Sequence, residues 1–116
     1  MRMKILVVDS NLLSTRTIAM MYEAYGCDVR IASDVKTSVD GVIQFPFNAV
    51  VMGPSFFREC GAQLHAAIKG IRPELCIAAT GGPQALAPEE LCSADVHLRP
   101  THFFSDLCRY LASRAR

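Results

Sequence analysis

The chain has 116 residues, enough for one domain over residues 1–116 and too few for two, and 51% of them are hydrophobic and 20% charged. A domain of this size forms a core without disulfides or a metal, and its net charge of +1 gives no electrostatic case for binding nucleic acid or an anionic membrane surface. No apolar run approaches the length of a membrane span. The apolar run behind the basic N-terminus ends at Asp9, too early for a secretion signal, so we expect a cytoplasmic protein.

Short apolar runs alternate with segments of helical periodicity along the whole chain. In order, we predict a strand at 4–8, a helix at 12–25, a strand at 28–32, a helix at 35–44, a strand at 48–52, a loop at 53–59, a helix at 61–71, a strand at 75–79, a loop at 81–83, a helix at 88–93, a strand at 95–98 and a helix from a cap at Thr101 to 113. Such alternation predicts βαβ units and a parallel sheet. With right-handed crossovers the result is an α/β fold, a doubly wound three-layer sandwich.

The first helix carries apolar residues at helical spacing, which predict its buried face. They are Leu13, Thr17, Met20, Met21 and Ala24.

The cysteines and histidines do not form a metal or disulfide pattern. Five cysteines are an odd number, and none belongs to a CxxC pair, so they predict reduced and mostly buried thiols. His65, His97 and His102 lack the spacing of a metal motif. We therefore expect no metal and no other cofactor.

Five landmarks fall in an order that resembles the receiver domain of two-component response regulators, over essentially the whole chain. They are ILVVDSN at 5–11, AVVMG at 49–53, Gly61 with Leu64, AATG at 78–81, and Arg99 with Pro100. The resemblance implies a flavodoxin-like (βα)5 fold with a five-stranded parallel sheet in the order 2-1-3-4-5.

The same resemblance implies a phosphorylation pocket, which this sequence changes. The family holds Mg²⁺ with acidic residues after the first strand, phosphorylates an aspartate after the third, and places a Ser or Thr after the fourth and a lysine after the fifth. The matching residues here are Asp9, Ser10, Gly53, Thr80 and Arg99, of which only Asp9 and Thr80 keep the family's residue type. Mg²⁺ prefers anionic oxygen ligands, and an aspartyl phosphate needs a carboxylate nucleophile. We therefore expect a pseudo-receiver that keeps the fold and is not an enzyme.

Loss of the acidic cluster leaves Arg99 without the negative charge that the family's lysine faces. Because a guanidinium suits a carboxylate, we expect Arg99 to form an ion pair with Asp9 across the top of the sheet.

Aromatic and half-apolar residues indicate where a partner would bind. The resemblance implies a partner or dimer surface made by the fourth helix, the fifth strand and the last helix. Val96 stands there at the family's aromatic switch position, beside His97, and Phe103 and Tyr110 lie along one edge of the helix, either as core or as interface. In the predicted 53–59 loop, Phe56 and Phe57 either cover the vacated pocket or are offered to a partner.

The hypothesis we favour is a phosphorylation-independent, receiver-like signalling module in a two-component-type pathway. It would act by protein–protein contact with a histidine kinase or another signalling protein, or as a homodimer. The alternative is a small-ligand or anion sensor that uses the vestigial pocket, with Arg99 binding the anion. A residual phosphoryl acceptor is a third and less favoured hypothesis.

Overall fold

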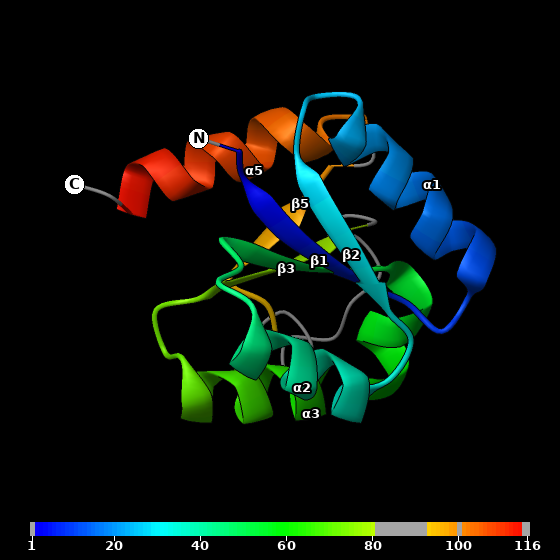
Figure 1. Ribbon diagram of the computed structural model, residues 1–116, viewed down its shortest axis with the longest axis vertical. Helices are drawn as coiled ribbons and strands as arrows, with labels where there is room; N and C mark the ends of the chain where they lie inside the picture. The colour runs from blue at the N-terminus through cyan, green and yellow to red at the C-terminus, as the bar shows by residue number, and fades with distance from the viewer. Residues whose placement is uncertain (1, 81–92, 100, 115–116) are drawn as a thin grey trace.

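The structure, a computed structural model, describes residues 2–80, 93–99 and 101–114 (Figure 1). Its strands are β1 (Lys4–Val8), β2 (Asp28–Ala32), β3 (Ala49–Met52), β4 (Cys76–Thr80) and β5 (Val96–Leu98), and its helices are α1 (Leu12–Glu23), α2 (Val35–Gln44), α3 (Pro54–Ile71) and α5 (Phe103–Arg114). The predicted loop at 81–83 and nearly all of the predicted helix at 88–93 lie outside the described residues. No helix in the described ranges is long and apolar enough to cross a membrane.

The five strands form one parallel sheet in the order β2-β1-β3-β4-β5, which confirms the predicted flavodoxin-like α/β fold. In the register, Val8 lies beside Met52 and Met52 beside Ala79. The central strands therefore end level with one another. The residues that follow β1 and β3 meet Thr80, the last residue of β4, at the carboxyl edge of the sheet, where open α/β folds place their sites.

Helices cover both faces of the sheet, α1 and α5 on one side and α2 and α3 on the other (Figure 1). Side chains alternate along β1, so the strand contributes to both core layers. Ile5 and Val7 pack toward α1 and α5, while Leu6 and Val8 pack toward α2 and α3. Burial on both faces explains why the central strands are continuous apolar runs. It also raises the pKa of the Cys76 thiol to about 11, so this cysteine stays protonated at neutral pH.

The buried face of α1 is not the one that the sequence predicts. The residues that face the core are Thr15, Ile18, Ala19 and Tyr22. The predicted stripe is exposed instead, with Leu13 75% and Met20 68% exposed. The reason is Thr15, whose hydroxyl donates to the carbonyl oxygens of Asp9 at 3.2 Å and Asn11 at 2.9 Å. Because these bonds satisfy the hydroxyl, a polar residue occupies a core position and shifts the apolar stripe.

Helix α3 begins at Pro54, so the loop predicted over 53–59 is wrong. Proline is favoured at the first helical position, where its missing N–H has no partner to lose. The helix also runs through Gly61, where an added Cβ would lie 2.8 Å from Cδ1 of Phe57. Glycine is therefore needed at 61 for close approach of the Phe57 ring one turn earlier.

Candidate functional site

Asp9 is the centre of the site at the carboxyl edge. It follows β1, is only 1% exposed, and its backbone N–H donates to the carbonyl of Ala32. Its Oδ1 accepts hydrogen bonds from the backbone N–H groups of Ser10 at 2.8 Å and Phe56 at 3.0 Å. Its Oδ2 is buried and has no hydrogen-bond partner among the described residues. One oxygen of the carboxylate is thus committed to the backbone and the other is shielded.

Gly53 lies directly against this carboxylate. A Cβ added to Gly53 would overlap Asp9 Oδ2 and lie 2.5 Å from Asp9 Cγ. The backbone at Gly53 has φ −72° and ψ 164°, a conformation that any residue adopts. Position 53 therefore needs glycine for space, because Asp9 fills the volume that a side chain would take.

The contact between Asp9 and Phe56 also caps α3. Gly53 is the N-cap residue and offers no side-chain acceptor, so the first N–H groups of the helix need another partner. Asp9 reaches across from β1 and accepts from Phe56 N–H, the third helical position. A carboxylate at a helix N-terminus is also favoured by the helix dipole. Asp9 thus supplies to α3 the acceptor and the negative charge that a capping aspartate would bring.

Thr80 lies at the same edge, at the end of β4. It is buried, and its hydroxyl donates to the carbonyl oxygen of Met52 at 3.3 Å. The bond ties the end of β4 to the end of β3, next to Gly53.

Arg99 does not bind Asp9, so the predicted ion pair is wrong. Its guanidinium binds Asp106 through two contacts, Nη2–Oδ1 at 2.7 Å and Nε–Oδ2 at 3.0 Å, and its backbone N–H donates to Oδ2 as well. Asp106 lies in the first turn of α5, so it is within reach by local chain geometry. The Arg99 side chain is 54% exposed there and keeps its hydration, whereas pairing with buried Asp9 would remove it from water.

The ion pair with Arg99 also lowers the pKa of Asp106. Hydrogen bonds from the Arg99 guanidinium hold the pKa of the Asp106 carboxyl well below its usual range, because they stabilise its charged form.

The donor set at the carboxyl edge does not suit Mg²⁺. Among the described residues of this edge Asp9 supplies the carboxylate, and its Oδ1 already accepts two backbone hydrogen bonds. Ser10, at the second acidic position, is exposed and contacts Asp9 through its backbone N–H. In the described ranges no group of three His, Cys, Asp or Glu side chains is placed to hold a metal ion. Mg²⁺ is held by carboxylates and retained waters in near-octahedral geometry, which this arrangement does not offer.

Phe56 and Phe57 are buried, 2% and 5% exposed, so of the two alternatives the one that offers them to a partner is wrong. They stand in the first turn of α3 and pack into the core on the α2 and α3 side. The Phe57 ring also meets the ring of His97 edge-on, with the centroids 5.5 Å apart.

Four other residues of the predicted interaction surface are half-buried: Val96, His97, Phe103 and Tyr110. The Tyr22 hydroxyl donates to the carbonyl of Phe103, which holds α5 against α1. Arg114 lies over the ring of Tyr110, 5.6 Å from its centroid. These residues pack partly against the core, and their role as an interface stays a prediction.

The sequence did not predict the exposed apolar side of α1. Leu12, Leu13 and Met20 lie there in solvent, with Ile31 of the neighbouring strand β2 also exposed. The signal that could have revealed it is the pattern of Ile18, Ala19 and Tyr22, which defines a competing stripe on the opposite side.

Comparison with solved structures identifies the fold. A response regulator receiver protein from Pseudomonas putida matches with a TM-score of 0.75 and 18% identity over 98% of each chain. The chain has the fold of a receiver domain. The receiver domain of a sensor histidine kinase from Pseudomonas aeruginosa, solved with magnesium coordinated in its active-site cleft, matches with a TM-score of 0.75 and 18% identity over 97% of each chain.

A third matching structure is that of a complex. A chain from the complex of histidine kinase ThkA with response regulator protein TrrA has a TM-score of 0.72 and 14% identity, over 96% of this chain and 97% of that one. No protein-family model and no curated protein sequence matches the chain. At these low sequence identities, the comparisons establish the fold of the chain and nothing beyond it.

Proposed function

We propose that the chain is a receiver-like signalling module of a two-component-type pathway that acts by protein–protein contact, without phosphorylation and without enzymatic activity. The observation that carries the proposal is the position of the Asp9 carboxylate against Gly53. It fills the place in which a phosphoacceptor side chain would stand.

The nucleophile is missing in chemistry as well as in space. Aspartyl phosphate formation needs a carboxylate, and Gly53 has no side chain. The nearby hydroxyl of Thr80 donates to the Met52 carbonyl. A hydroxyl becomes a useful nucleophile only beside a general base, and the described structure gives Thr80 no side-chain partner of that kind.

The Asp9 carboxyl already caps the helix N-terminus at which a phosphoryl group would act. Position 53 is the N-cap of α3, so a phosphoryl group there would bring negative charge to the helix N-terminus. Asp9 already supplies a negative charge that accepts from Phe56 N–H. Asp9 therefore already occupies the N-terminus of α3 at which a phosphoryl group on position 53 would act.

Exposed apolar side chains on α1 support a role in protein contact. Leu12, Leu13 and Met20 lie in solvent on one helix, an arrangement that monomeric proteins limit and interfaces use. The matched complex of a histidine kinase with a response regulator makes a kinase or another signalling protein the class of partner we propose. A second copy of the chain is the other partner to test.

The anion-sensor alternative has less support. It needs Arg99 to face the vestigial pocket, and Arg99 is held by Asp106.

The test is incubation with acetyl phosphate and Mg²⁺ followed by intact-mass measurement, with a conventional receiver domain as the positive control. We expect the control to gain the mass of one phosphoryl group and this chain to gain none. A stable phosphoryl adduct on this chain would overturn phosphorylation independence. Light scattering after size exclusion, with and without acetyl phosphate, would separately test the homodimer.

A further inference from the structure

The sheet face that α2 and α3 cover is left open at the amino ends of β1 and β2. Lys4 lies beside Asp28 in the register, and Leu6 lies beside Arg30. Since side chains alternate along a strand, Lys4, Asp28 and Arg30 share the face of the core residue Leu6. Helix α2 ends at Gln44, and the chain turns back through residues 45–47 into β3. Charged residues therefore occupy the end of this face that the helix does not reach.

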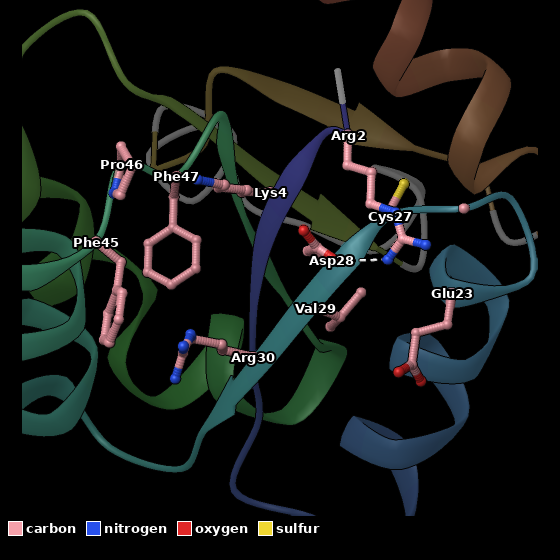
Figure 2. Close-up of a pocket in the computed structure, with 11 residues that line it drawn as sticks. Arg2, Lys4, Glu23, Cys27, Asp28, Val29, Arg30, Phe45, Pro46 and Phe47 are labelled. Atoms are coloured by element: carbon pink, nitrogen blue, oxygen red, sulfur yellow. Dashed lines mark hydrogen bonds and ion pairs between the residues drawn. The ribbon is translucent and has the colours of Figure 1, made fainter.

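An open cavity of about 590 Å³, shaped as a groove, wraps around the start of the edge strand β2, from the 45–47 segment on this face to Glu23, Cys27 and Val29 on the other (Figure 2). This volume is shared by the two faces of β2, so the side lined by Lys4, Arg30 and Phe45 holds only part of it. Phe47 and Cys27, which help to line the cavity, are 3% and 6% exposed and belong to the two core layers. The cavity thus has walls anchored in the core.

The charges around the cavity are mainly positive. Arg2 Nη1 binds Asp28 Oδ1 at 2.9 Å, and both side chains are well exposed. The Arg30 guanidinium lies over the Phe45 ring, 3.8 Å from its centroid. Among the described residues no carboxylate oxygen lies within 4.0 Å of the Lys4 ammonium or the Arg30 guanidinium.

One carboxylate, Asp28, lies on the same strand face as Lys4 and Arg30 and is paired with Arg2, whereas the second, Glu23, lies apart. Figure 2 shows Glu23 on α1, on the far side of β2 from Phe45, while Lys4 and Arg30 lie toward the 45–47 segment. The part lined by Lys4, Arg30 and Phe45 therefore combines one aromatic platform with two cations that form no ion pair with a carboxylate of the described residues.

From this arrangement we propose that the cavity binds a nucleoside monophosphate. Phosphate oxygens accept from Lys4 and from the N–H edge of Arg30, since ammonium and guanidinium groups are the usual donors to phosphate. The planar Arg30 guanidinium, stacked on Phe45, offers its other face to a base, because guanidinium groups stack on π-systems. The site is at the opposite end of the strands from Asp9 and Gly53 and does not depend on the proposed signalling role.

The test is calorimetric titration with adenosine monophosphate, beside inorganic phosphate and adenosine as separate probes. Arg30→Gln and Lys4→Gln remove one charge each from exposed positions, so both variants should fold. Lys36→Gln on α2 is the matched control, since Lys36 is also exposed but pairs with Asp40 away from the cavity. We expect saturable one-to-one binding of adenosine monophosphate, weakened about tenfold in each cavity variant and unchanged in the control.

Amide chemical shifts provide the second measurement. Titration should shift the signals of Lys4, Arg30 and Phe45, and Phe45→Leu should weaken adenosine monophosphate more than inorganic phosphate. The proposal is overturned by absence of saturable binding at millimolar concentration, by inorganic phosphate or adenosine binding as tightly as the nucleotide, or by cavity variants that bind like the unmodified protein.

Discussion

The Asp9 carboxylate and the Cα of Gly53 are so close that a Cβ at position 53 would lie 2.5 Å from Asp9 Cγ and 2.8 Å from Asp9 Cβ. We expect Gly53→Ala to lower the free energy of unfolding by about 1–3 kcal/mol, because overpacking a buried site forces its neighbours to move. The backbone conformation at Gly53 suits alanine, so the cost comes from this contact. Urea denaturation monitored by circular dichroism measures it.

The control is the same substitution in an Asp9→Ala background. Removing the carboxylate relieves the contacts with Oδ2 and Cγ but leaves the Cβ of residue 9 at 2.8 Å, so the two substitutions should be less than additive although part of the cost remains. Asp9→Ala alone should also speed hydrogen exchange at Phe56, whose N–H loses its acceptor. If Gly53→Ala cost the same in both backgrounds, the contact with Asp9 would not be the cause.

Two glycines of α3 should respond to alanine with opposite signs. At Gly61 a Cβ would lie 2.8 Å from the Phe57 ring, whereas at Gly70 nothing lies within 4 Å. We therefore expect Gly61→Ala to destabilise the protein by about 1–3 kcal/mol through overpacking. Gly70→Ala should stabilise it by about 0.4–1 kcal/mol through reduced entropy of the unfolded chain. Denaturant midpoints of the two variants test this, and equal shifts would contradict it.

The layers could be predicted because the central strands are uniformly apolar and their breaks coincide with glycine, proline or charge, whereas the strand order followed from the resemblance to receiver domains. The start of α3 could not be predicted, since Pro54 is equally consistent with a break and with the first residue of a helix. The face of α1 was missed because Thr15, a polar residue, occupies a core position through hydrogen bonds that exist only once β1 and α1 have met.

In the candidate site, too, residue positions could be predicted from the sequence and side-chain partners could not. Asp9 and Gly53 could be placed at one edge because each follows a strand of a parallel sheet. The side-chain partners could not be predicted: Arg99 turns to Asp106, which comes within reach through the geometry of the first turn of α5. The cavity at the amino ends of β1 and β2 is lined by Arg2, Arg30 and Phe45, which are far apart in the sequence. No local sequence pattern therefore predicts it.

The orientation of α1 predicts contrasting effects at two apolar residues. Ile18 is 4% exposed and lies in the core, whereas Met20 is 68% exposed. Ile18→Ala should therefore cost about 2–5 kcal/mol through lost burial and the cavity left behind. Met20→Ala should change stability by no more than about 0.5 kcal/mol. Thermal and urea unfolding of the pair measure the difference, and a large loss at Met20 would favour the opposite face.

Asp95, which directly precedes β5, binds residues of two elements, α3 and β4. Its Oδ2 accepts from Lys69 Nζ at 2.7 Å and from Ile77 N–H at 2.9 Å, and its Oδ1 lies 3.3 Å from His65 Nε2. Burial raises the pKa of the Asp95 carboxyl, but the hydrogen bonds from Lys69, Ile77 and His65 outweigh it and hold the pKa below its ordinary value. The folded state therefore favours the charged carboxylate.

This shift fixes the direction of a pH effect on stability. A carboxyl whose pKa is lower in the folded state stabilises the protein above its unfolded pKa, about 4, and loses that contribution as pH falls through the folded value. Asp95→Asn should cost about 1–3 kcal/mol at pH 7, and its unfolding curve should converge on that of the unmodified protein as the solution is acidified. Asp34 and Asp106, whose pKa values are also lowered, are present in both proteins and cancel in the difference. Urea denaturation at stepwise lower pH gives the two curves; if they ran parallel, the stabilisation would not depend on the charge of Asp95.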